Sequence, residues 1–163
     1  MSYLLDSNVF IEAKQRYYGL DFHPAFWDWL VQANAAGTVY SIEKVAEELR
    51  NHQDDLTVWA GQRGAEFFLP PTDQMAQSLV DASTWANACG RYDQAAVGDF
   101  LAAADYYLVA HALAHAHIVV THETRENRRT RVKIPDACDA LQVQCMTPFE
   151  MFRATGTRFV GVA

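Results

Sequence analysis

The sequence predicts a three-layer α/β/α fold built on a parallel sheet of four or five strands, and two observations carry this prediction. Short apolar segments alternate along the chain with segments of helical periodicity. Each apolar segment is hydrophobic through its middle, which is typical of strands buried on both faces of a parallel sheet. In such folds ligands bind beyond the carboxyl ends of the strands, so we expect the functional site at that edge.

The first element is a short buried strand. Residues 3–5 are apolar and are followed by Asp-Ser-Asn, as expected for a strand that ends at a turn or a helix cap. This places Asp6 at the carboxyl end of the strand. Apolar residues at helical spacing then predict a helix over 24–36, which stops at Gly37.

Two further strands and one helix are expected before the middle of the chain. Residues 39–40 form the second expected strand, and Ser41 is the expected N-cap of the next helix. Residues 67–69 form the third strand, closed by Pro70. The apolar stripe of the intervening helix consists of Ile42, Val45 and Leu49.

The second half of the chain repeats this alternation. Helices are expected over 72–88 and 101–116, separated by the polar stretch 89–99, and residues 118–120 form a strong fourth strand. The chain ends with two weaker expected elements, a strand over 142–145 and a short helix with Pro148 at its first position.

Composition indicates one compact soluble domain over residues 1–163. Half of the residues are hydrophobic and 12% are aromatic. No apolar run approaches the roughly 20 residues that cross a bilayer, and the N-terminus lacks a secretory leader, so we expect a cytoplasmic protein. The three cysteines are expected to be reduced thiols, with Cys138 and Cys145 buried.

Charge is distributed unevenly. The net charge of −7 argues against a nucleic-acid ligand, because phosphate contacts need Lys and Arg. The segment 125–133, RENRRTRVK, nevertheless carries a local charge of +4. We expect it to contact substrate phosphates through Arg125, Arg128 and Arg129. A solvated loop or a dock for an acidic partner segment is the alternative interpretation.

Four acidic side chains are expected to meet at the carboxyl edge of the sheet. Asp6 follows the first strand, Glu123 follows the fourth strand, and Asp105 opens the helix that leads into that strand. Glu48 joins them because its helical phase sets it beside the buried stripe, whereas Glu47 faces solvent. Taken singly, each has an ordinary explanation, such as a helix cap for Asp6 or a favourable first-turn acid for Asp105.

Repulsion among these acids predicts a cation. Two carboxylates about 4 Å apart repel by roughly 4 kcal/mol at an effective dielectric constant of about 20. Hard oxygen ligands without a nearby His or Cys suit Mg²⁺ or Mn²⁺. Such ions activate water and stabilise charge on a phosphate, so the acids indicate phosphodiester hydrolysis.

The segments YLLDSNVFI, VAEEL, AADYYLVAHALA and IVVTHE, taken in this order, resemble the PIN-domain nucleases, which include the ribonuclease toxins of bacterial toxin-antitoxin systems. The resemblance covers nearly the whole chain. The aromatic stretch 15–29 and the segment KIPDAC at 133–138 are similar to a larger, less characterised PIN-like subgroup. The family's four acids, which bind metal and act in catalysis, match Asp6, Glu48, Asp105 and Glu123, with Asn8 and Thr121 as polar supports.

The resemblance implies a metal-dependent endoribonuclease, the toxin of a toxin-antitoxin pair, with an antitoxin protein as partner. It also implies a homodimer, for which the aromatic segment 17–29 with Met151 and Phe152 offers a hydrophobic patch. A non-catalytic PIN-like module that binds a partner is the main alternative. A haloacid-dehalogenase-like phosphatase is a weaker one, since that chemistry requires Asp where this chain has Asn8.

Two further features have competing interpretations. His111 and His115 are four residues apart on a helix and His117 is near, which would suit zinc, but the chain shows no Glu after His111 and no distant third ligand. Trp27 and Trp29 are expected in the core or a dimer contact rather than in a base-stacking surface.

Overall fold

A five-stranded parallel sheet forms the centre of the molecule in the computed structural model, which describes residues 1–161. The strand order is β3-β2-β1-β4-β5 and every neighbouring pair is parallel. This confirms the predicted α/β fold class. The strands are β1 (Tyr3–Leu5), β2 (Val39–Ile42), β3 (Phe68–Leu69), β4 (Ile118–Val120) and β5 (Cys145–Met146).

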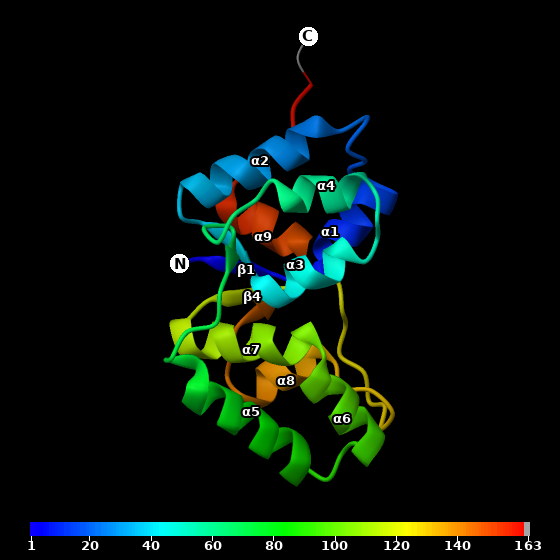
Figure 1. Cartoon of the computed structure of the whole chain (residues 1–163), viewed down its shortest axis with the longest axis vertical. Helices are drawn as coiled ribbons and strands as arrows, with labels where there is room; N and C mark the ends of the chain where they lie inside the picture. The colour runs from blue at the N-terminus through cyan, green and yellow to red at the C-terminus, as the bar shows by residue number, and fades with distance from the viewer. Residues whose placement is uncertain (162–163) are drawn as a thin grey trace.

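Helices connect the strands and cover both faces of the sheet. In Figure 1, α1, α2, α4 and α9 lie on one side of the sheet, and α5, α6, α7 and α8 lie on the other. The helical segments are α1 (Ser7–Glu12), the π-helix η1 (Ala13–Tyr17), α2 (Pro24–Ala35), α3 (Glu43–Arg50), α4 (Asp55–Gly61), α5 (Met75–Ala88), α6 (Gln94–Ala102), α7 (Ala104–His115), α8 (Ile134–Ala140) and α9 (Pro148–Thr155).

The inner strands are fully covered, as their uninterrupted apolar character predicts. Leu4 and Leu5 of β1 and Val119 and Val120 of β4 are each 0% exposed. They belong to one continuous hydrophobic core that includes side chains from the helices on both faces. Because β1 lies between β2 and β4, the carboxyl ends of three parallel strands meet at one edge.

Two predicted boundaries are wrong for identifiable reasons. Ser41 is not a helix cap: it lies within β2, and its buried hydroxyl donates to the carbonyl of Leu5 at 2.6 Å. The polar stretch 89–99 was expected to separate two helices, yet α6 begins inside it at Gln94. An extended residue, Ala103, then divides α6 from α7. The expected helix over 101–116 therefore covers the end of α6 and the whole of α7.

Two other elements depend on local capping. The sequence pattern did not indicate α4, whose N-cap Asp54 accepts from the backbone N–H of Thr57 at 3.2 Å in a capping box. The last helix begins as predicted at Pro148, behind the N-cap Thr147. The fifth strand lies at 145–146, later than the expected 142–145, because Gln142 has a left-handed backbone that cannot extend a strand.

Within residues 1–161, no helix combines the length and the apolar character that membrane crossing requires.

Candidate active site

Asp6 is the most buried of the four predicted acids. It directly follows β1 and is the N-cap of α1, and only 3% of it is exposed. One carboxylate oxygen accepts from the backbone N–H of Ser7 at 2.7 Å, and the other accepts from the hydroxyl of Thr121 at 2.8 Å. Asp6 is therefore both a helix cap and a carboxylate presented at the carboxyl edge of the sheet.

Asn8 and Thr121 hold the ends of β1 and β4 together. The amide of Asn8 donates to the Thr121 hydroxyl at 3.0 Å, and its carbonyl oxygen accepts from the backbone N–H of His122 at 3.0 Å. The backbone N–H of Glu123 donates to the same Thr121 hydroxyl at 3.1 Å. These bonds attach the segment after β4 to the first turn of α1, next to Asp6.

Asp105 is the second residue of α7, which begins directly after the extended residue Ala103. Glu48 of α3 is half-buried, whereas its neighbour Glu47 is exposed and pairs with Lys44 at 3.0 Å, as the helical phase predicts. The negative charge of Glu48 raises the pKa of Asp105, so the structure brings α3 and α7 together at their acidic positions.

Burial and mutual repulsion perturb the acids. The pKa of Asp6 is raised to about 8, first by desolvation and then by the charge of Asp105. The pKa of Asp105 is raised to about 6 by desolvation and by the charges of Glu123 and Glu48, against an opposing effect of Arg131. Asp6, Glu48, Asp105 and Glu123 thus form one electrostatic cluster. Such shifts are frequent at functional sites.

Glu123 differs from the other acids because its oxygens are already occupied. One oxygen accepts from the guanidinium of Arg131 at 2.7 Å and lies 3.5 Å from the ammonium of Lys133. The other accepts from the backbone N–H of Ile134, the first residue of α8, at 2.9 Å. Its side chain is 9% exposed, so Glu123 is a nearly buried anchor for the segment that precedes α8.

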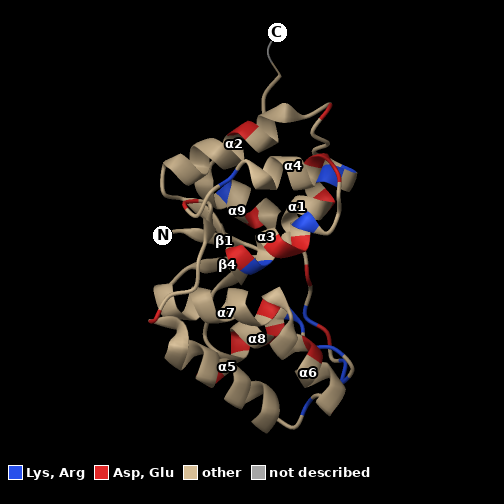
Figure 2. Ribbon diagram, viewed as in Figure 1, with Lys and Arg blue, Asp and Glu red and all other residues tan. Residues whose placement is uncertain are grey.

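An open cleft of about 210 Å³ is lined by one of these acids, Asp105. Asp105, Asp99 and Arg131 supply its charged groups, and Phe100 and Val132 contribute to its apolar wall. Figure 2 shows acidic positions on α3 and α7 and basic positions on the loop between β4 and α8. The cleft thus combines carboxylates with a cation, which is a suitable lining for a phosphodiester held near a metal ion.

Sequence reasoning did not single out Arg131 and Lys133 as partners of Glu123. The signal was present, because Arg131 and Lys133 flank the buried Val132 in an extended segment, and alternate residues of such a segment point the same way. The three arginines expected to bind substrate each form an ion pair with an acid, and their contact with substrate stays a prediction. These pairs are Arg125 with Asp139 at 2.6 Å, Arg128 with Glu126 at 3.3 Å and Arg129 with Asp93 at 3.4 Å.

The donor set fits a hard divalent cation. Asp6 is a buried carboxylate that accepts only two hydrogen bonds shorter than 3 Å, and the nearby charge on Asp105 is also unfavourable without a cation. Within the described part of the chain, no three His, Cys, Asp or Glu side chains are already arranged as a metal-ligand group. Ligation by these acids therefore requires side-chain rearrangement.

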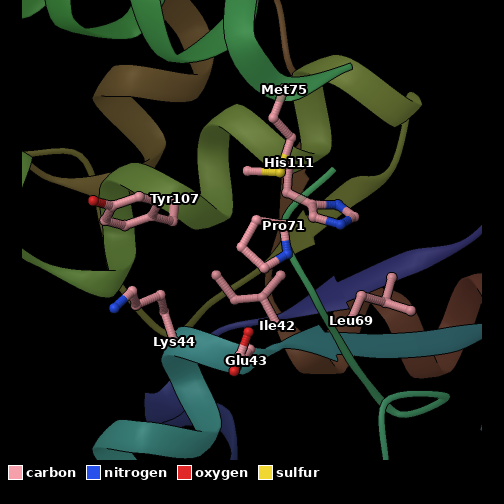
Figure 3. Close-up of a pocket in the computed structure, with 8 residues that line it drawn as sticks. All are labelled: Ile42, Glu43, Lys44, Leu69, Pro71, Met75, Tyr107 and His111. Carbon is pink, nitrogen blue, oxygen red and sulfur yellow. The ribbon is translucent and has the colours of Figure 1, made fainter. Parts of the chain in front are cut away.

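His111 and His115 of α7 pack with His117, which follows the helix, and the described residues hold no group of three His, Cys, Asp or Glu side chains that could bind zinc. The ring centroids of His111 and His115 are 4.7 Å apart, and those of His111 and His117 are 5.5 Å apart with nearly parallel planes. His115 and His117 lie within hydrogen-bond distance of the hydroxyls of Thr72 and Ser2. Figure 3 shows the His111 ring beside Pro71, in a largely apolar pocket between α3, α5 and α7.

The aromatic residues of the N-terminal segment are mostly in the core. Phe26 and Trp27 are buried, and Trp29 is half-buried against Phe152. Phe152 is itself only 8% exposed and Met151 is 0% exposed, which contradicts the expectation that these two residues supply an exposed dimer patch. Homodimerisation stays a prediction, but these two residues do not supply a surface for it.

The sheet order, the helical layers and the acids at the sheet edge define the class of protein as PIN-like α/β. A chain in the structure of FitAB bound to an IR36 DNA fragment has the same fold, with a TM-score of 0.54, 19% sequence identity and coverage of 90% of this chain and 95% of that chain. The model of the family described as a domain of unknown function (DUF4411) matches residues 3–159, so the chain belongs to that family. A comparison with curated proteins finds no match.

Proposed function

We propose that this protein is a metal-dependent endoribonuclease that hydrolyses RNA phosphodiester bonds with Mg²⁺ or Mn²⁺. The observation that carries the proposal is the cluster of Asp6, Glu48 and Asp105 at the carboxyl edge of a PIN-like sheet, with raised pKa values at both aspartates. A buried, mutually repelling set of carboxylates is costly unless it serves a cation. A chain of the same fold occurs in a structure of FitAB bound to a DNA fragment, which supports a nucleic acid as ligand.

The four acids have two kinds of role in this proposal. Asp6, Asp105 and Glu48 would hold a divalent cation, which when bound would activate water and stabilise the charge that develops on the phosphate. Thr121 and Asn8 orient Asp6 and the chain after β4. Glu123 contributes by fixing Arg131 at the cleft, where the guanidinium can bind the phosphate that enters beside Asp105.

We further propose that the chain acts as the toxin of a toxin-antitoxin pair. An antitoxin segment that covers the acidic cleft would block access of RNA to Asp105. The proposed products are ends with a 5′-phosphate and a 3′-hydroxyl, formed when water attacks phosphorus and the bond to the 3′-oxygen breaks. The resemblance of the four sequence segments to the ribonuclease toxins of the PIN family supports an antitoxin partner.

The test combines cleavage with cation binding. Purified protein is incubated with single-stranded RNA in Mn²⁺, Mg²⁺ or EDTA, and Mn²⁺ binding is measured by calorimetry. We expect cation-dependent cleavage that falls at least about 100-fold in Asp105→Asn, because electrostatic stabilisation at a phosphoryl centre is worth several kcal/mol. Glu48→Gln should lose activity, whereas the matched control Glu47→Gln, one residue away and exposed, should keep it.

Two results would overturn the proposal. Cleavage that persists in EDTA would show that the acids do not serve a cation. A protein that binds no Mn²⁺ and cleaves no RNA, but still binds a protein partner, would be a PIN-like interaction module instead.

A further inference from the structure

Three rings from three separate elements meet at the surface beside the acidic cluster. Tyr17 is the last residue of η1, His122 follows β4, and Phe149 lies in the first turn of α9. The Tyr17 and His122 centroids are 5.6 Å apart with planes inclined by 24°, so these two rings stack. The Phe149 centroid is 5.5 Å from that of Tyr17 and 5.7 Å from that of His122.

Packing of the fold does not account for this trio. Tyr17 is 41% exposed and Phe149 is 36% exposed, and neither belongs to the hydrophobic core or to the partly buried side chains that pack on it. Their neighbours Tyr18 and Met151, by contrast, do contribute to the core. Exposed aromatic surface that the core does not need is a feature of binding sites.

The trio is joined to the acidic cluster by the chain itself. Thr121, which donates to Asp6 at 2.8 Å, immediately precedes His122. The backbone N–H of His122 is bonded to Asn8, while its ring contacts Tyr17 and Phe149. Strands β4 and β5 both end at this edge, and η1 brings Tyr17 to it through a π-helical turn, a conformation frequent at functional sites.

Positive charge lies close to the rings. Arg16 precedes Tyr17, and its side chain is 68% exposed and pairs at 3.1 Å with the half-buried Glu12, whose charge also acts on His122. Arg125 follows His122 by three residues, and its side chain is 62% exposed and pairs with Asp139 at 2.6 Å. Single-stranded nucleic acid is bound by this combination of aromatic faces for bases and cations for the backbone.

We propose that Tyr17, His122 and Phe149 form a stacking platform for a nucleobase of single-stranded RNA, adjacent to the phosphate that enters the acidic cleft. The proposal rests on the proposed ribonuclease function for the identity of the ligand. A duplex would be a poor ligand, because its bases are already stacked within the helix. The platform would therefore make the enzyme selective for unpaired RNA.

Binding is measured separately from cleavage, by fluorescence anisotropy of a labelled single-stranded RNA oligonucleotide in EDTA. We expect Tyr17→Ala and Phe149→Ala each to weaken binding about 5-fold or more, since stacking is worth roughly 1–3 kcal/mol per base. Tyr17→Phe should bind like the wild type. Phe22→Ala is the matched control, because Phe22 is 68% exposed and makes no ring contact with the trio.

An oligonucleotide with abasic sites distinguishes stacking from general damage. We expect wild type and Tyr17→Ala to bind this oligonucleotide equally, at the weakened level. If Tyr17→Ala and Phe149→Ala leave RNA affinity unchanged but abolish binding of a protein partner, the platform proposal is overturned. If the platform variants lose binding while the wild type shows no cleavage in Mn²⁺, the platform stands and the ribonuclease proposal fails.

Discussion

Glu123 shows how a single side chain can hold together a segment of the chain. It accepts from Arg131 and from the backbone N–H of Ile134 and lies 3.5 Å from the ammonium of Lys133, so one carboxylate contacts two cations and the first residue of α8. Charged hydrogen bonds of this kind are roughly twice as strong as neutral ones. The resemblance to PIN-domain nucleases places the same side chain among the metal ligands, and this role stays a prediction beside the structural one.

Glu123→Gln should lower the free energy of unfolding by about 1–3 kcal/mol, because Arg131 and Lys133 lose a nearly buried partner. Urea denaturation measures this change. The control Glu47→Gln removes an exposed pair with Lys44 and should cost less than about 1 kcal/mol. Equal effects of the two substitutions would show that Glu123 is not an anchor.

Asp6 is expected to destabilise the fold when no cation is bound. Its pKa is raised to about 8 by desolvation and by Asp105, so the folded chain holds a proton that the unfolded chain releases near pH 4. Stability therefore falls as the pH rises between these values. In EDTA at pH 8, Asp6→Asn should be more stable than wild type by at least about 1 kcal/mol, because the amide needs no ionisation.

Thermal unfolding with and without Mn²⁺ tests this prediction. We expect Mn²⁺ to raise the melting temperature of wild type and to have little effect on Asp6→Asn, because a ligand stabilises only the state that binds it. Asp28→Asn, a change at an exposed acid of α2, should behave like wild type. A wild type that Mn²⁺ does not stabilise would contradict the role of Asp6.

At the scale of elements, caps and breaks determine where helices present their side chains. The break at Ala103 starts α7 so that Asp105 falls in its first turn, beside the cleft. Asp54 begins α4 and also forms an ion pair with Lys14 of η1. Through this pair α4 supports the π-helical segment that ends at Tyr17.

Asp54→Ala should lower the free energy of unfolding by about 1–2 kcal/mol, because α4 loses its N-cap and Lys14 loses a partner. Asp54→Asn should cost less, since Asn also caps helices well. Chemical denaturation of the two variants checks this order. If Asp54→Asn were as damaging as Asp54→Ala, the ion pair rather than the cap would dominate.

At the scale of the whole molecule, a buried histidine makes stability depend on pH. His111 is 3% exposed, and burial together with the charges of His115 and His117 lowers its pKa to about 4. Glu43 and Lys44 of α3 and Tyr107 of α7 also line the pocket around it. The folded protein must therefore keep His111 neutral at pH values where the unfolded chain binds a proton.

The contribution of neutral His111 to the free energy of unfolding should be fully present above the ordinary histidine pKa of 6.5. It should decrease as the pH falls toward 4. The loss attributable to His111 is about 2 kcal/mol by pH 5. Urea unfolding at pH 7 and pH 5 measures it. His111→Met should reduce the pH dependence, whereas the exposed control His52→Gln should leave it unchanged.

The layers and the first site residues could be predicted from local pattern. Residues 3–5 and 118–120 are apolar without interruption, which specifies buried parallel strands, and Asp6 follows one of them directly. Glu48 and Glu47 were distinguished by helical phase alone, and their exposure agrees. Boundaries such as the start of α6 could not be predicted, because the stretch 89–99 is polar. Its residues form the exposed face of a helix only when tertiary packing covers the opposite face of that helix.

The sequence by itself determined the α/β class, the acids at the carboxyl edge of the sheet and the resemblance to PIN-domain nucleases, because these depend on periodicity and on order along the chain. Only the tertiary structure decided that Glu123 is bound by Arg131 and Lys133, and that Tyr17 and Phe149 meet around His122. The contacts of Tyr17 with His122 and Phe149 join residues more than a hundred positions apart and depend on how helices pack on the sheet. No local pattern records that packing.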